Sequence, residues 1–360
     1  PLMADISQVL PSALDALMHS TAQRSIAIPN SEAVVVVLID GMGHINLRQA
    51  QEWGIDVGWL VESQPIAAAF PSTTPVSLAS FGTGLLPGHH GFVGATFLIP
   101  ELDVFLQPLK WQDSPSAKLV QPEPTYFEVA TRAGLNVTRI GPAAYASSGL
   151  TKAVLRGGAH SGAESLVELF DAIALALKNS QQLIYAYYPK LDKVGHVNGV
   201  DSDEWRAEMA EVAAFLRNLN DALGPGQSLC VTADHGMLDV TDRLWIEDRP
   251  SLMRDVRFIT GEPRMRHVFA QQGYEGSLLR SWQQLSDVAE IFSREEFIAT
   301  QLLGDVEEHV AARIGDVVAV SLGQSVLASR SVDERVSNLA GNHGGRTETE
   351  RLIPCAVLAG

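Results

Sequence analysis

The sequence has only two cysteines, no long apolar run and few basic residues, and each shortage excludes a class of protein. Cys230 and Cys355 lie in separate apolar runs, so we expect two buried free thiols in strands rather than a disulfide framework. No segment reaches the roughly 20 apolar residues that a transmembrane helix needs, and the printed N-terminus carries acids and does not look like a signal peptide. We therefore expect a cytoplasmic protein that does not associate with membranes.

Basic residues are outnumbered by acidic ones, 26 to 42, which gives a formal net charge of −16. Such a balance argues against a stable complex with nucleic acid, because the phosphate backbone would be repelled. It does not argue against a small phosphorylated substrate, because a bound metal reverses the field locally.

Several nucleotide-binding and hydrolase motifs are also missing. The sequence contains neither G-x-x-x-x-G-K-S/T nor G-x-S-x-G, so P-loop and nucleophile-elbow chemistry have no support. The run "GTGLLPG" from Gly82 to Gly88 is not G-x-G-x-x-G and does not follow a strand, which excludes a dinucleotide-binding oxidoreductase.

What the chain does contain is a series of continuous apolar runs that alternate with amphipathic helical stretches. Continuous apolar strands separated by helices indicate an α/β fold with a mostly parallel central sheet and helices on both faces. The expected strands are "AVVVVLID", "NVTRIGP", "QLIYAYYPKLD", "SLCVTAD" and, at the end of the chain, "LIPCAVLAG".

This alternation weakens from about residue 240 and returns near "AGNHGG". We expect residues 240–335 to form a small inserted α+β cap, and residues 1–239 together with 336–360 to form the core domain. The insertion and the loop 94–113 are expected to shape the pocket.

Three of the predicted strands end close to an aspartate: Asp40, Asp192 and Asp234. In open α/β sheets the carboxyl ends of the strands meet at one edge, where ligands bind. A single Asp at such a place is usually a turn former or a helix cap. Three of them, two with a nearby histidine, instead favour a functional site.

Histidines accompany these acids at spacings that suit metal ligands. Asp192 and His196 are four residues apart and share one face of a helical turn. His235 follows Asp234 directly, and His343 lies between glycines in "GNHGG". Mixed imidazole and carboxylate ligands suit Zn²⁺, with Mn²⁺ or Fe also possible. With Asp40, the six ligands fit two divalent metals with three ligands each.

The stretch "AAAFPSTTPVSLASF" leaves two interpretations of Thr74 open. Thr74 could be a helix N-cap before Pro75, since threonine and proline are favoured at these two positions. Alternatively, its hydroxyl is a nucleophile at a helix N-terminus, where free N–H groups favour an anion. A metal-bound threonine hydroxyl would lose its proton near neutral pH.

Five motifs in this order, spread from residue 38 to residue 345, resemble the alkaline phosphatase superfamily and most closely its nucleotide pyrophosphatase/phosphodiesterase branch. They are "LIDGMG", "FPSTTPVSLASFGTGLLPGHHG", "LDKVGHVNG", "TADHGM" and "NHGG". The resemblance implies an enzyme that hydrolyses a small phosphorylated substrate, possibly a nucleotide, through a phosphothreonine intermediate. The nucleophile of that branch lies nine residues before the Thr of a "TG" pair, which here gives Thr74.

The same resemblance divides the metal ligands between two sites. It implies one metal held by Asp192, His196 and His343, and a second held by Asp40, Asp234, His235 and the hydroxyl of Thr74.

The sequence departs from the branch at Ala95, where an Asn that donates to a phosphoryl oxygen is usual. Losing one preorganised donor typically costs a few kcal/mol of transition-state stabilisation. The main alternative is therefore a phosphomonoesterase or phosphonate hydrolase on the same metal core, followed by a non-catalytic metal- or phosphate-binding protein. Thr96, Lys193 and His44 are candidates for substrate binding, and Arg346 is a further cation near the site residues.

Overall fold

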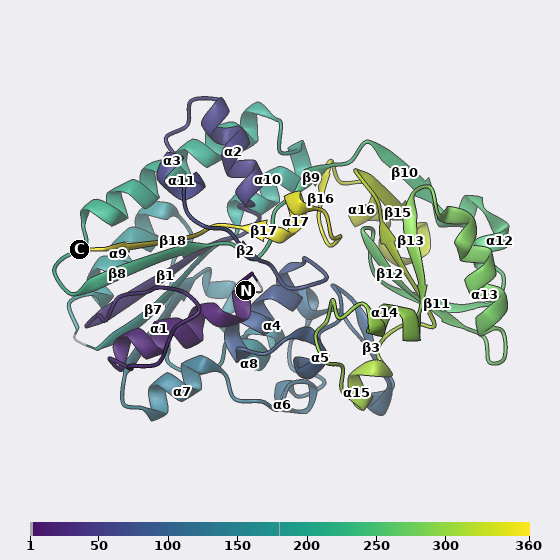
Figure 1. Cartoon of the computed structure of the whole chain (residues 1–360), viewed down its shortest axis with the longest axis horizontal. Helices are drawn as coiled ribbons and strands as arrows, with labels where there is room; N and C mark the ends of the chain where they lie inside the picture. The colour runs from purple at the N-terminus through teal and green to yellow at the C-terminus, as the bar shows by residue number, and fades with distance from the viewer. Residues whose placement is uncertain (1–2, 180) are drawn as a thin grey trace.

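A computed structural model describes residues 3–179 and 181–360, arranged around one six-stranded sheet (Figure 1). Five of its strands are parallel, and the last strand of the chain pairs antiparallel at one edge. In spatial order the strands are β18 (Cys355–Ala359), β8 (Gln227–Thr232), β1 (Ala33–Ile39), β7 (Gln182–Tyr188), β5 (Asn136–Gly141) and β6 (Ala159–Gly162).

Helices cover both faces of this sheet, because its central strands are apolar on both sides. Every residue of β1 is buried, as expected for a strand between two helical layers. One layer contains α1 (Val9–Leu17), α4 (Thr74–Thr83), α7 (Tyr126–Arg132) and α8 (Gly149–Val154); the other contains α2 (His44–Glu52), α3 (Gly58–Val61), α9 (Leu166–Ala176), α10 (Lys190–Asn198) and α11 (Asp203–Asp221).

A second, antiparallel sheet lies to one side of the six-stranded sheet (Figure 1). It has an apolar cluster of its own around the buried Trp282. Its strands are β11 (Val256–Glu262), β12 (Met265–Ala270), β14 (Val317–Ser321) and β13 (Ala289–Ser293), accompanied by the parallel pair β10 (Asp242–Trp245) and β15 (Ser325–Ala328) and by α12 (Pro250–Met253), α13 (Glu275–Trp282), α14 (Arg294–Ala299), α15 (Glu308–Ala311) and α16 (Arg330–Ser337).

Short elements connect the two sheets and the helical layers. Three of the strand pairs are antiparallel two-stranded ribbons. These elements are β2 (Ile66–Ala67) with β17 (Leu352–Ile353), β3 (Phe97–Ile99) with β4 (Val104–Leu106), β9 (Leu238–Asp239) with β16 (Gly341–Asn342), and the helices α5 (Pro87–His90), α6 (Ala117–Val120) and α17 (Glu348–Arg351).

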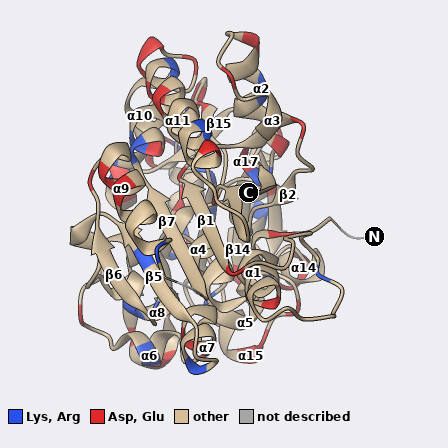
Figure 2. Ribbon diagram, turned by 90° about the vertical axis from the view of Figure 1, so that its left-hand side faces the viewer, with Lys and Arg blue, Asp and Glu red and all other residues tan. Residues whose placement is uncertain are grey.

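The predicted fold class is confirmed: the fold is α/β, with a mostly parallel central sheet between two helical layers. Cys230 and Cys355 are free thiols on neighbouring strands, as expected, but only Cys230 is buried, and Cys355 at the edge of the sheet is partly exposed. Within the described residues, no helix is both long and apolar enough to cross a bilayer. Charged residues lie mainly on helices and loops, and the strands of the central sheet are almost free of them (Figure 2).

Candidate metal centre

The carboxyl ends of three neighbouring parallel strands bring the predicted ligands to one edge of the sheet. Each strand leads directly into the segment that carries an aspartate, and β16 supplies a further loop. Asp40 follows β1, Asp192 and His196 lie on α10 after β7, Asp234 and His235 follow β8, and His343 follows β16.

The first cluster consists of Asp40, Asp234 and His235. Nε2 of His235 lies 3.4 Å from Oδ1 of Asp40 and 3.4 Å from Oδ2 of Asp234. All three residues are buried, and one ligand atom from each lies within 4.8 Å of the others. This spacing lets the three side chains bind one ion.

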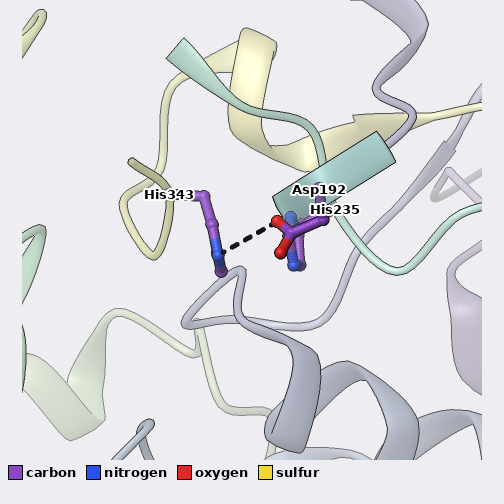
Figure 3. A group of neighbouring side chains, drawn as sticks. All are labelled: Asp192, His235 and His343. Atoms are coloured by element: carbon purple, nitrogen blue, oxygen red, sulfur yellow. Dashed lines mark ion pairs between the residues drawn. The ribbon is translucent and has the colours of Figure 1, made fainter. Parts of the chain in front are cut away.

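The second cluster consists of Asp192, His196 and His343. Oδ1 of Asp192 is 3.5 Å from Nε2 of His196 and 3.8 Å from Nε2 of His343, and the two Nε2 atoms are 3.2 Å apart. The ring of His235 stacks on that of His343 with centroids 3.5 Å apart, so the two clusters adjoin. Figure 3 shows Asp192, His235 and His343 meeting from three separate segments, with the ion pair between Asp192 and His343 dashed.

Each of the three imidazoles is oriented by the backbone. A histidine that ligates through one nitrogen normally uses the other for a hydrogen bond that fixes its tautomer and ring orientation. Here the Nδ1 atom is bonded in every case, which leaves Nε2 facing the clusters. The acceptors are the carbonyl oxygens of Gly341 for His196 (2.8 Å), Ser72 for His343 (2.8 Å) and Gly236 for His235 (3.1 Å).

The three carboxylates each keep one buried oxygen without a hydrogen-bond partner: Oδ1 of Asp40, Oδ1 of Asp192 and Oδ2 of Asp234. Burial, reinforced by the negative charges of Asp234 and Asp192, raises the pKa of Asp40 well above its usual range. Burial and the neighbouring imidazoles of His235 and His196 lower the pKa of His343. Unpartnered buried carboxylate oxygens beside imidazole nitrogens form a donor set that fits divalent cations.

Gly41 lets the backbone of the turn after β1 lie close to Asp192 and Asp234. Its φ is +74°, and a Cβ atom there would lie 3.1 Å from the Cα of Asp192. Its N–H donates to Oδ1 of Asp234 over 3.2 Å. Because only glycine adopts this conformation without strain, the turn after β1 depends on this residue.

Thr74 is not a helix cap. Helix α4 begins at Thr74 itself and Thr73 occupies the N-cap position, so the capping interpretation of Thr74 is wrong by one residue. The Thr74 hydroxyl instead points to the first cluster, with Oγ1 3.1 Å from Nε2 of His235.

A cavity of about 320 Å³ opens beside these residues. Four of the candidate catalytic and metal-binding residues line it: Asp40, Thr74, Asp192 and His196. Loop 94–113 contributes Pro108 and Leu109, as expected. No residue of the region 240–335 is among the described residues that line this cavity, so the expected role of the insertion in shaping it is not observed.

The candidates for substrate binding are divided by the structure. Lys193 lines the cavity, and its Nζ lies 5.7 Å from the ring centroid of Tyr145. Thr96 lies in a different groove, where its hydroxyl exchanges hydrogen bonds with the backbone of Gly261. His44 is buried at the start of α2 and is not among the residues that line the cavity.

Two further residues named from the sequence face the second sheet. The backbone N–H of Ala95 donates to Glu262 over 2.8 Å. The guanidinium of Arg346 forms an ion pair with Glu290. Neither lines the cavity within the described part of the chain.

Sequence reasoning missed several residues of the cavity, among them Tyr187 and Arg139. The hydroxyl of Tyr187 donates a hydrogen bond to Oδ2 of Asp40, and the guanidinium of Arg139 lines the cavity wall. A signal existed for both. Arg139 interrupts the strand run "NVTRIGP" with a charge, and Tyr187 alternates with Tyr185 in "QLIYAYY".

Comparison with known families agrees with this geometry. Residues 34–346 match the family described as type I phosphodiesterase / nucleotide pyrophosphatase. The chain belongs to this family. As a type I phosphodiesterase / nucleotide pyrophosphatase family member it is a hydrolase of phosphoric esters or anhydrides. A search of curated proteins found no match.

Solved structures of similar fold come from two kinds of enzyme. Murine ectonucleotide pyrophosphatase/phosphodiesterase 5 aligns with a TM-score of 0.71 at 17% identity, over 89% of this chain and 87% of that one. An inactive variant of the same murine protein is known in complex with AMP. Phosphonoacetate hydrolase from Sinorhizobium meliloti 1021, in complex with phosphonoacetate, aligns with a TM-score of 0.69 at 18% identity, over 94% of this chain and 92% of that one. At these identities the likeness shows the fold of this family member.

Proposed function

We propose that the protein is a two-metal phosphodiesterase or nucleotide pyrophosphatase that uses Thr74 as its nucleophile. The observation that carries this proposal is the position of the Thr74 hydroxyl. It lies 3.1 Å from Nε2 of His235, and it shares one cavity with Asp40 and Asp192. A nucleophile must reach both the ligand cluster and the space that a substrate enters, and Thr74 meets both requirements.

The two ligand clusters support the proposed division of metals. Asp192, His196 and His343 would hold one cation, and Asp40, Asp234, His235 and Thr74 the other. Their imidazole and carboxylate donors suit Zn²⁺ best, and Mn²⁺ or Fe share the same preference. When bound, such cations lower the pKa of a coordinated hydroxyl and stabilise negative charge on phosphoryl oxygens.

The proposed reaction proceeds in two displacements at phosphorus. The Thr74 oxygen forms a bond to phosphorus while the bond to the leaving oxygen breaks, and that oxygen departs with the bonding electrons. The resulting phosphothreonine is then hydrolysed, so that a water oxygen replaces the Thr74 oxygen and the hydroxyl is restored. Lys193 is the proposed cationic contact to the substrate, since it lines the same cavity.

A phosphonate hydrolase on the same core is the second candidate, because Ala95 offers no side-chain amide to a phosphoryl oxygen. The solved relatives bind AMP in one case and phosphonoacetate in the other, both small phosphorus oxyanions. We propose that the substrate of this chain is also a small phosphorylated molecule.

Two further expectations remain proposals. The apolar cluster around Trp282 supports treating residues 240–335 as a subdomain inserted into a core of residues 1–239 and 336–360. The two free thiols support a cytoplasmic location.

The experiment compares Thr74→Ala with Thr74→Ser in metal-loaded protein. We expect Thr74→Ala to lose at least about 10³-fold in kcat while metal content stays unchanged, and Thr74→Ser to retain part of the activity. Acid-quenched wild-type enzyme should carry, on the peptide that contains Thr74, a phosphoryl group that keeps the second ester of a diester substrate. A fully active Thr74→Ala variant would refute the mechanism.

Substrate class is tested separately. Rates on p-nitrophenyl phosphate, bis(p-nitrophenyl) phosphate and the p-nitrophenyl ester of a nucleoside 5′-phosphate are compared with phosphate release from phosphonoacetate. We expect the diesters to be preferred. A clear preference for phosphonoacetate would establish the second candidate instead.

A further inference from the structure

Arg139 is the only Lys, Arg, Asp or Glu residue in the six strands of the central sheet, all of whose residues the structure describes. Its side chain is half-buried on β5, and its Nε atom is fully buried without a hydrogen-bond partner. No acidic side chain among the described residues forms an ion pair with it. A buried cation is normally paired, because removing an unpaired charge from water costs several kcal/mol.

Two other polar groups without partners lie beside Arg139. Arg139 is in register with Tyr185 on β7 and with His160 on β6. The Tyr185 hydroxyl and Nε2 of His160 are both buried and have no hydrogen-bond partner, and the Tyr185 side chain is only 3% exposed. The three side chains therefore form a row across adjacent strands, and all three line the same cavity.

This row lies nearer the amino ends of the strands than the metal ligands, which follow the carboxyl ends. Tyr187, two residues beyond Tyr185 on the same face of β7, bonds Asp40 at the edge of the sheet. Two residues of strand span roughly 7 Å. Thr74 and the row of Arg139, His160 and Tyr185 thus line one continuous cavity.

We propose that Arg139, His160 and Tyr185 form a subsite for a second anionic group of the substrate, a carboxylate or a phosphate, located away from the reacting phosphorus. The inference rests on the proposed function, because it takes the metal clusters as the site of the reacting group. The guanidinium fork matches the two oxygens of such an anion, while the Tyr185 hydroxyl supplies a further donor.

The chemistry of the remaining wall limits the linker between the two anionic groups. Leu78, Leu150 and Leu155 also line the cavity and carry apolar side chains. We therefore expect a short linker with little polar character, about five bonds long to span roughly 7 Å. A cation and hydrogen-bond donors grouped in one part of an otherwise apolar cavity orient the substrate and also increase its affinity.

The test measures binding without turnover. Titration calorimetry on the metal-loaded protein compares 5-phosphonopentanoate with 5-phosphonopentanamide, which lacks the second anionic group, and butane-1,4-diphosphonate serves as the phosphate-type arm. We expect at least one of the two probes with two anionic groups to bind about tenfold more tightly than the amide. The better of the two identifies whether the second group is a carboxylate or a phosphate.

Variants assign this preference to Arg139. Arg139→Met should bind the acid and the amide within about twofold of each other, with its amide affinity close to that of wild type. Arg139→Lys should recover part of the preference, because it restores the charge without the fork. Arg132→Met, an exposed charge removal on α7, serves as the matched control and should keep the full preference.

Three results would overturn the subsite. The first is equal affinity of wild type for the acid and the amide, and the second is a preference for the acid that survives in Arg139→Met. The third is that neither probe with two anionic groups binds. These results are distinguishable from failure of the proposed function, which is read from the turnover of Thr74→Ala. An active Thr74→Ala variant removes the mechanism but leaves the ratio of affinities interpretable.

Discussion

The hydroxyl of Tyr187 donates a hydrogen bond to Oδ2 of Asp40, while Oδ1 of the same carboxylate is buried without a partner. One oxygen is thus fixed by the strand that carries Tyr187, and the other is left to face His235 at 3.4 Å. A hydrogen bond of this kind orients a carboxylate that is positioned to bind a metal.

Replacing Tyr187 with phenylalanine should therefore weaken the site without unfolding the protein. We expect Tyr187→Phe to lower metal affinity or kcat/KM by about 10–100-fold, the range typical for groups that hold a metal ligand. Metal titration and steady-state kinetics measure the two effects. Tyr188→Phe is the control, because Tyr188 bonds Glu208 instead, and an equal loss in both variants would contradict this role.

Removing the metals should destabilise the fold. The three aspartates of the clusters would face one another in a buried site with no counter-charge, and a ligand present at 1,000 times its Kd adds about 4 kcal/mol of stability. We expect a chelator to lower the Tm by several degrees and Zn²⁺ to restore it, as followed by calorimetry. Asp234→Asn should show a smaller shift, and an unchanged Tm in protein shown to be metal-free would argue against the centre.

Glu262 predicts a pH dependence of stability that is separate from the metal site. Burial raises the pKa of Glu262 to about 8. Because the folded-state pKa lies above that of the unfolded chain, the stability that this group contributes is complete below about pH 4.5 and is lost as the pH rises through about 8.

The matching variant is Glu262→Gln, which keeps an acceptor for the N–H of Ala95. It should be more stable than wild type at pH 9 by about a few kcal/mol, since each pKa unit corresponds to about 1.36 kcal/mol, and this advantage should vanish near pH 4. Denaturant unfolding at several pH values measures the difference. Glu204→Gln, an exposed change on α11, should leave the pH profile unaltered, and parallel profiles for wild type and Glu262→Gln would refute the prediction.

Arg264 and Glu350 form a fully buried ion pair with two N–O distances of 2.8 Å. Glu350 also accepts from the N–H of Gly345, two residues after His343. Arg264→Met would leave the carboxylate buried and uncompensated, which costs about 3–5 kcal/mol. We also expect weaker metal binding, because the loop that carries His343 loses an anchor.

Denaturant unfolding and metal titration measure both effects of Arg264→Met. The control is Arg330→Met, which removes the exposed ion pair between Arg330 and Asp248. Exposed pairs contribute little, so its effect should be much smaller. Equal destabilisation by the two variants would show that burial does not make the Arg264–Glu350 pair more important for stability than an exposed pair.

The apolar runs and their polar ends predict much of the fold. The run "AVVVVLID" is apolar on both sides of the strand, so it is buried fully only in a sheet that is covered on both faces. Asp40 then lies at the carboxyl end of this strand. The spacing of Asp192 and His196 likewise requires one helical face, which α10 provides. These features depend on local periodicity, which is why the sequence alone is sufficient for them.

Other features depend on contacts between distant segments. Whether the Thr74 hydroxyl caps its helix or faces His235 depends on where α4 begins, and Thr73 and Thr74 are equivalent in the local pattern. Thr96 and Lys193 were equally reasonable substrate contacts, yet only Lys193 lines the cavity. The direction of a single side chain follows from packing, not from the residue type.

By itself, the sequence determined the fold class and the family and predicted a set of metal ligands, because these follow from hydrophobic periodicity and from ordered motifs. Only the tertiary structure decided that Arg139, Tyr185 and His160 stand in one row beneath those residues. The physical reason is strand register. Hydrogen bonds between three strands set which residues become neighbours, and segments 20 or more positions apart carry no local record of that alignment.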